Sequence, residues 1–224
     1  MPSRHRGGIP ETRLIICCMS VFNEAEWIER AILSVGNHVD RIIILDGAYE
    51  NFMKVNNLDF FLSNDETREK IARAAAHVTA SISFIQPERP WRNELEKRSY
   101  FFNYGWRGDW FFILDGNEEC VGDVAAGMSQ VRQLDAFAAA VKVVMPDGQW
   151  FTPHRFLSWQ PKMRYERNHW TIKGKWYGIN FVSADPDPYP LITDFHIVNH
   201  SHTGVRREMR DRYVEFMNKR GWAE

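Results

Sequence analysis

Residues 109–119 read Asp109-Trp-Phe-Phe-Ile-Leu-Asp-Gly-Asn-Glu-Glu119, and the expected fold follows from this stretch. Its apolar run, residues 110–114, is short and aromatic-rich, which predicts a strand buried on both faces. Three carboxylates and a carboxamide follow at once. Unpaired carboxylates repel one another and are costly to desolvate, so such a cluster is best explained by a cation or a positively polarised ligand that shares the site. Mg2+ and Mn2+ prefer oxygen ligands, so one interpretation is a metal site. The other is a polar turn before a helix N-terminus, where acidic side chains are favoured.

The composition limits the class of protein. The chain has 224 residues, 44% hydrophobic and 25% charged, which predicts one sizeable α/β domain rather than a disordered chain. A formal net charge of -1 gives no strong preference for nucleic acid or membranes. No apolar run approaches membrane-spanning length, and no apolar segment follows the basic start. Three cysteines, an odd number, give no disulfide framework. We therefore expect a cytoplasmic protein without a membrane span.

Other apolar runs predict further strands of the same sheet. Residues 14–19 and 41–45 read as buried strands, joined by a helix that begins near Glu24 and is capped by Asn23. Such a strand–helix–strand unit requires a right-handed crossover and parallel neighbours. The remaining predictions are an irregular segment at 48–64, a helix from Asp65 to about 79, a strand near an edge at 81–85, helices at 91–104, 121–133 and 206–220, strands at 136–145 and 192–198, and a hairpin ending at 150–152.

Polar side chains follow at least three of the predicted strands. Asp46, Asp115, and the pair His200 and His202 each come after an apolar run. In an open parallel sheet, ligands bind outside the carboxyl ends of the strands. One nucleotide could span Asp46 and Asp115 if their strands are neighbours. The two histidines lie at strand spacing on one face, and are either a source of a nitrogen ligand for a Mn2+-type ion or part of a solvated loop.

The segment 152–176 differs in composition from the rest of the chain. It holds six Lys or Arg against one acid, Glu166, with Trp159, Tyr165, Trp170 and Trp176 interleaved. Cations mixed with aromatic side chains are typical of single-strand nucleic-acid binders. The alternative is a solvated hairpin whose tryptophans belong to the core, and we favour it because large aromatic side chains are commonly buried.

The order of these features resembles the GT-A glycosyltransferases, of the large family-2 type. Four places carry the resemblance, and together they cover residues 14 to about 212. They are Met19-Ser-Val-Phe-Asn-Glu24, the second strand ending in Asp46-Gly47, Arg92-Asn93 followed by Gly108-Asp109-Trp110 and Leu114-Asp-Gly-Asn-Glu118, and Ile197-Val-Asn-His200 followed by Thr203-Gly204 and an Arg-rich helix.

The resemblance implies a single GT-A (Rossmann-like) domain, α/β in class, with a mostly parallel central sheet and helices on both faces. Residues 1–12 are then a flexible basic N-terminus and 13–224 the catalytic domain. Within it, 13–120 form a nucleotide-binding half, and 121–224 form an acceptor half with the C-terminal helix. The implied reaction moves a sugar from a nucleoside diphosphate sugar to an acceptor hydroxyl, and a UDP-sugar is the favoured donor. The acceptor could be a glycan, a small molecule or a modified nucleic acid.

The resemblance and the chemistry of the reaction together suggest site residues. The donor nucleotide is expected at Ser20, Phe22, Glu24, Asp46, Arg92 and Asp115. The divalent ion, Mn2+ or Mg2+, is expected at Asp115, Asn117, His200 and His202. An inverting transfer needs a base for the acceptor proton, and the candidates are Glu118, Glu119, His169 and Asp194. A cation at this place would stabilise the leaving diphosphate, whose negative charge grows in the transition state.

Two positions depart from the family pattern. Asn117 stands where the second Asp of the metal motif is usual, and a carboxamide brings no charge to a metal. We therefore expect little metal binding without the diphosphate. Residues 47–50 are Gly-Ala-Tyr-Glu in place of the usual Gly-Ser-Thr-Asp, which leaves the ribose contacts open.

Two other functions are consistent with the sequence. A nucleotidyltransferase shares the sheet and the carboxylate-bound Mg2+, but it usually needs a Gly-rich phosphate loop after the first strand, and residues 20–24 are not one. A nucleic-acid-binding module, or a sugar transferase that modifies DNA, would use the basic aromatic segment 152–176, and its DNA binding would depend steeply on salt.

Overall fold

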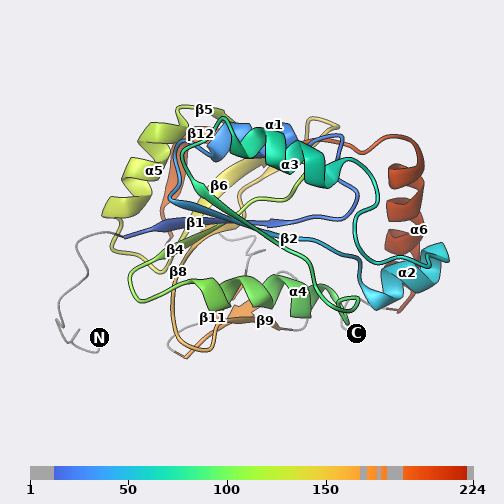
Figure 1. Ribbon diagram of the computed structural model, residues 1–224. Coiled ribbons are helices and arrows are strands. Elements are labelled where there is room, and N and C mark those ends of the chain that lie inside the picture. Colours follow the sequence, from blue (N-terminus) through green and yellow to red (C-terminus); the bar gives the residue numbers. More distant parts are fainter. Residues whose placement is uncertain (1–12, 167–170, 176–177, 181–188, 221–224) are drawn as a thin grey trace.

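A computed structural model describes residues 13–166, 171–175, 178–180 and 189–220 (Figure 1). Four strands form the parallel half of its main sheet, in the order β3-β2-β1-β4. They are β1 (Ile15–Ser20), β2 (Arg41–Leu45), β3 (Ser81–Ile85) and β4 (Trp110–Ile113). The apolar runs predicted these strands because a parallel strand is covered on both faces. The edge position of β3 agrees with its partly exposed side chains.

The second half of the main sheet is mixed. It continues from β4 in the order β8-β6-β12-β5, with β7 paired to β6. β6 and β12 are parallel to each other, and the other pairs are antiparallel. The bounds are β5 (Glu118–Gly122), β6 (Ala138–Val144), β7 (Trp150–Phe151), β8 (His154–Ser158) and β12 (Leu191–Asn199). The antiparallel pairing of β6 and β7 confirms the hairpin predicted to end at residues 150–152.

Helices cover both faces of this sheet, which confirms the predicted α/β class (Figure 1). On one face lie α1 (Ile28–Val35), α3 (Thr67–Ala75) and α5 (Val124–Gln133). On the other lie α4 (Glu94–Tyr100), the 3-10 turn Phe101–Tyr104, and a small antiparallel sheet of β9 (Arg164–Glu166), β10 (Thr171–Lys173) and β11 (Gly178–Asn180). At one end of the molecule, α2 (Glu50–Asn56) packs against α6 (Gly204–Arg220). None of the described helices is long and apolar enough to cross a membrane.

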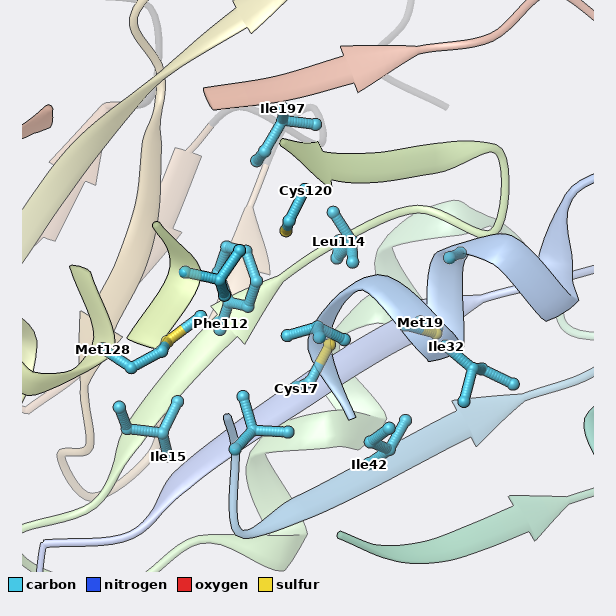
Figure 2. Packing of buried hydrophobic residues seen from close by; sticks show 14 of the residues in the cluster. Ile15, Cys17, Met19, Ile32, Ile42, Phe112, Leu114, Cys120, Met128 and Ile197 are labelled. Carbon is cyan, nitrogen blue, oxygen red and sulfur yellow. The ribbon is translucent and has the colours of Figure 1, made fainter. Parts of the chain in front are cut away.

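The alternation of side chains along the strands divides the core into two layers. Ile15, Cys17 and Met19 of β1 face the layer under α1, α3 and α5, whereas Ile16 and Cys18 face α4. Figure 2 shows the first layer, in which side chains from β1, β2, β4, β5, β12 and two helices meet. Its aromatic centre is Phe112, stacked on Phe156 of β8 at a centroid distance of 4.5 Å.

Three local predictions were wrong, each because a tertiary contact replaced a local signal. Asn23 does not cap α1, because its backbone is left-handed and its side-chain oxygen accepts from the N–H of Asn64. The segment 48–64 contains the helix α2 rather than only irregular chain. The helix predicted from residue 121 begins only at Val124, because residues 118–122 form an edge strand along β12.

Phe112→Ala tests the packing of the first layer. Phe112 is fully buried and touches Phe156 and Phe195, so we expect its truncation to lower the free energy of unfolding by about 3 to 5 kcal/mol. Leu33→Ala, at an exposed position of α1, should change it by no more than about 0.5 kcal/mol. Urea titration of both variants measures the difference, and equal losses would contradict this account of the core.

Candidate functional site

A cavity of about 600 Å3 opens at the carboxyl ends of the parallel strands. Ser20 ends β1, Gly47 lies just beyond β2 and Asp115 just beyond β4, and all three line the cavity. Ligands of open α/β sheets bind at this edge, and the volume is in the range of small-molecule sites, about 300 to 1,000 Å3. The strands that Asp46 and Asp115 follow, β2 and β4, are not neighbours, because β1 lies between them, but the loops after all three strands reach the cavity.

The lining is rich in charge of both signs. Five cationic side chains come from three elements, α4, β8 and α6, and face four carboxylates. The cations are Lys97, Arg98, Arg155, Arg206 and Arg210, and the carboxylates are Glu24, Glu94, Asp115 and Glu118. Because the cationic side chains outnumber the carboxylates, the site can bind an anionic ligand while its internal ion pairs stay intact.

Asp115 pairs with an arginine of α4. Its Oδ1 and Oδ2 lie 3.0 and 3.2 Å from Nη2 of Arg98, and Nε of Arg98 donates to Oε1 of Glu94 at 2.7 Å. Glu94 and Arg98 are one helical turn apart, a spacing at which side chains meet. The guanidinium is thus held between two carboxylates at the edge of the cavity.

Glu118 is a buried anchor for four strands. Only 1% of its surface is exposed; Oε1 accepts from Nη2 of Arg155 at 2.6 Å and from Nδ2 of Asn199 at 3.2 Å. Its Oε2 accepts from the backbone N–H of Asp115 at 2.8 Å. Both oxygens are therefore occupied, which does not suit Glu118 to the predicted role of base.

Asn117 connects the tip of β4 to the end of β12. Its side-chain Nδ2 donates to the backbone carbonyl of His200 at 2.7 Å, and its backbone carbonyl accepts from the backbone N–H of His200 at 2.9 Å. The side chain lines the cavity and is 8% exposed. The carboxamide thus holds the wall of the cavity in place, a role that a carboxylate could not fill by donation.

Glu24 and His202 place unpartnered polar atoms at the cavity. Oε1 of Glu24 accepts from Nη2 of Arg206 at 2.9 Å, whereas Oε2 of Glu24 and Nδ1 of His202, 3.5 Å apart, are buried and have no hydrogen-bond partner among the described residues. Burial raises the pKa of Glu24 to about 7, against the lowering effect of Arg206. Burial, with Arg206 and Arg210 nearby, lowers the pKa of His202 to about 3. Glu24 thus combines an oxygen that has no hydrogen bond among the described residues with a pKa near neutrality.

Lys97 is a buried residue of the cavity lining. Its Nζ donates to the carbonyls of Val21 and Gly47, both at 2.7 Å, and so ties together the loops that follow β1 and β2. Burial lowers its pKa to about 7, while Asp46 and Glu24 oppose that shift and Arg98 and Arg206 add to it. The site therefore holds a lysine whose charge depends on the neutral pH range.

Most of the residues predicted to bind the nucleotide or the metal are brought together. The cavity lining includes Ser20, Phe22, Glu24, Asp115, Asn117, Glu118 and His202. Among the described residues, Asp46, Arg92, Glu119, Asp194 and His200 are not part of it. His169 lies outside the described residues.

Asp46 is buried below the cavity rather than at its surface. Its Oδ1 accepts from the N–H of Gly47 and from the hydroxyl of Ser63, at 2.7 and 2.6 Å, and its Oδ2 accepts from Nε2 of Gln86. With no exposed surface, the carboxylate fixes the loop after β2 instead of reaching a base or ribose. The structure corrects the expected contact because both oxygens are already bonded.

Four other predicted residues lie outside the cavity lining. Successive residues of a strand point to opposite faces, so Glu119 points away from Glu118, towards Arg30 at 2.8 Å. His200 stacks on Trp27 at 4.2 Å and places Nε2 3.0 Å from Oε2 of Glu119. Asp194 is exposed within β12, well before its end, and Arg92 is exposed before α4.

These contacts do not fit a protein-held divalent metal. Asp115 and Glu118 are paired with arginines, Asn117 holds a backbone carbonyl through its amide nitrogen, and His200 faces Glu119. Over the part of the chain that the structure describes, no group of three or more His, Cys, Asp or Glu side chains is arranged to hold an ion. Oδ2 of Asp115 and Oε1 of Glu118 accept from guanidinium groups, and Oδ1 of Asp115, which has no hydrogen bond among the described residues, lies 3.0 Å from Nη2 of Arg98.

The sequence prediction missed the cations of the site. Lys97 and Arg98 were assigned to a predicted helix without a role, and Arg155 to the basic segment 152–176. Arg206 and Arg210 belong to the Arg-rich helix that was part of the family resemblance. The usable signal was the spacing Glu94–Arg98, which places an acid and a base on one helix face.

Comparison with known proteins gives matches at the level of structure. No family model matches the sequence, and no curated protein does. Mannosyltransferase PcManGT from Pyrobaculum calidifontis, in complex with GDP-Man and Mn2+, is 14% identical over 61% of this chain and 36% of its own, with a TM-score of 0.41. Glucosyl-3-phosphoglycerate synthase from Mycobacterium tuberculosis, in complex with Mg2+ and UDP, is 17% identical over 66% and 50%, with a TM-score of 0.41.

A third match belongs to another class of protein. 4-Diphosphocytidyl-2C-methyl-D-erythritolsynthase from Anaerococcus prevotii is 9% identical over 92% of this chain and 96% of its own, with a TM-score of 0.40. The first two matches are GT-A glycosyltransferases, the class that the sequence resembles, and the chain spans half of their length or less. At these identities and TM-scores, the function of the chain has to be argued from its own residues.

Lys97→Met tests the buried lysine. Between the folded pKa of about 7 and the unfolded value of 10.5, the unfolded chain binds the extra proton, so wild-type stability rises with pH. Relative to Lys97→Met, which cannot titrate there, the wild-type unfolding free energy should rise by about 1 to 2 kcal/mol from about pH 7 to about pH 9. Urea titrations at both pH values measure this, and parallel pH profiles of the two proteins would contradict the assignment.

Proposed function

We propose that this chain is a glycosyltransferase that moves a sugar from a nucleoside diphosphate sugar to an acceptor hydroxyl. The favoured donor is a UDP-sugar. The observation that carries the proposal is the cavity at the carboxyl ends of β1, β2 and β4, into which five Lys and Arg side chains converge. Guanidinium groups match phosphate oxygens in geometry and charge. A nucleoside diphosphate is the ligand class that combines this position in an α/β sheet with such a lining.

Aromatic side chains beside the cations support a nucleoside. Phe22, Tyr49, Phe52 and Tyr213 line the same cavity, and Phe52 and Tyr213 bring α2 and α6 together at 5.2 Å between ring centroids. The guanidinium of Arg206 lies 5.9 Å from the ring of Phe22 and 5.5 Å from that of Phe52. A base that stacks on this aromatic side would direct its phosphates towards the arginines.

The chemistry of the reaction assigns roles to the lining. In the transfer, the bond from the sugar C1 to the β-phosphate oxygen breaks, its electron pair goes to that oxygen, and the acceptor oxygen bonds to C1. The acceptor proton needs a base. Glu24 fits this role better than Glu118, because Oε2 of Glu24 has no hydrogen-bond partner in the described part of the chain and both oxygens of Glu118 are bonded.

Arg210→Ala tests the nucleotide site. Arg210 is exposed on α6 and reaches the cavity, so its removal should weaken UDP or GDP binding about fivefold or more without loss of stability. Arg207→Ala is the matched control, because Arg207 lies on the same helix outside the cavity lining. Isothermal titration calorimetry measures both affinities. Equal effects of the two variants would contradict a specific site at this cavity.

Glu24→Gln tests the base. With a panel of nucleotide sugars and acceptors, release of the nucleoside diphosphate should fall by about 100-fold or more, while affinity for the free diphosphate changes little. Glu69→Gln, at an exposed position of α3, controls for loss of a carboxylate. Full activity of Glu24→Gln would rule out this role. Pyrophosphate release from a nucleoside triphosphate and a sugar phosphate would identify a nucleotidyltransferase instead.

A further inference from the structure

Arg98 occupies the place at Asp115 that a cation would take. Its side chain is 13% exposed and lines the cavity, with Nη2 at 3.0 Å from Oδ1 of Asp115 and Nε at 2.7 Å from Oε1 of Glu94. Burial opposes the charged form, but Asp115 and Glu94 outweigh it and raise the pKa of Arg98 well above its ordinary value. The cavity therefore holds a permanent positive charge in a fixed position.

Displacing this guanidinium to admit a divalent ion would be costly. A metal at Asp115 would have to break the ion pair with Arg98 and would leave the guanidinium, largely buried, with only Glu94. Removing one partner of a buried ion pair leaves the other charge buried and uncompensated. This costs more free energy than most exposed contacts contribute. The neighbouring carboxylate, Glu118, offers no alternative oxygen, because Arg155 and the backbone of Asp115 hold it.

We propose that Arg98 supplies the positive charge that stabilises the leaving diphosphate, so that this chain transfers sugar without a divalent metal. The inference rests on the proposed function. When the C1–oxygen bond breaks, its electron pair stays on the β-phosphate oxygen, and the acceptor proton passes to Glu24. The charge that develops on the diphosphate then meets Arg98 and the other arginines of the lining, and fixed donors at such a place lower the barrier.

Unused donors in the lining agree with this role. A guanidinium has five N–H donors, and the contacts of Arg98 with Glu94 and Asp115 involve Nε and Nη2. Nε of Arg155 and Nε of Arg206 are both buried without a hydrogen-bond partner among the described residues. A bound diphosphate would bring acceptor oxygens to a set of arginines that already neutralise the local carboxylates.

The wild-type protein gives the first test. UDP and GDP should bind with the same dissociation constant, within about twofold, in EDTA and in millimolar Mn2+. Electron paramagnetic resonance should show Mn2+ free in solution, or bound to the nucleotide as it is without protein. If Mn2+ raises the affinity for UDP or GDP by about tenfold or more, the inference is overturned and the proposed function still stands. Failure of both nucleotides to bind under either condition would overturn the proposed function as well.

Variants of Arg98 give the second test. Arg98→Ala should lose at least about tenfold in UDP affinity in EDTA and should recover part of it with Mn2+, because Asp115 is then open to the ion. Arg98→Lys keeps the charge and should retain part of the metal-free affinity. Arg89→Ala is the matched control, since Arg89 also pairs with a carboxylate of α4 but lies outside the cavity lining. An Arg98→Ala protein with wild-type affinity in EDTA would overturn the assignment.

Discussion

The burial of Glu118 constrains the whole ligand edge of the sheet. A carboxylate that is 1% exposed is tolerated only when its charge is matched and its oxygens are bonded. Arg155 provides the charge from β8, Asn199 a donor from the end of β12, and Asp115 a backbone N–H from the tip of β4. The side chain on β5 therefore fixes the relative positions of four strands, and with them the wall of the cavity.

This constraint explains why the mixed half of the sheet matters to the site. β8 joins β4 antiparallel, which brings Arg155 alongside Ile113, whose carbonyl accepts from Nη1 of that arginine. β12 ends beside β5, so its last residues lead directly into α6. α6 then packs on α2 through Met209, Tyr213 and Met217 and carries Arg206 to Glu24. The parallel half provides the open edge, and the mixed half, with the α6 helix that follows it, brings three of the four arginines of the lining.

The sequence predicted the parallel half well and the contents of its edge only in part. The apolar runs of β1, β2 and β4 are readable because burial on both faces leaves few polar positions. Asp46 and Asp115 look alike in sequence, since each follows such a run and precedes glycine. They differ through tertiary contacts. Ser63 and Gln86 bond to the Asp46 carboxylate, whereas Arg98 reaches Asp115 from a helix that precedes β4. Local sequence carries no signal for either arrangement, nor for the pairing that makes residues 118–122 a strand.

The balance of charge also accounts for Asn117, which stands where the metal motif of the family usually has its second Asp. Asp115 and Glu118 are each matched by one arginine, Arg98 and Arg155. An aspartate at residue 117 would add a third carboxylate to this pair, and it could not donate to the carbonyl of His200 as the carboxamide does at 2.7 Å. A neutral donor at 117 suits a site whose carboxylates are already neutralised by protein, whereas a site built to attract a metal gains affinity from each added negative ligand. Asn117 and Arg98 are thus two parts of the same arrangement, in which guanidinium groups and not acidic side chains set the charge presented to a ligand.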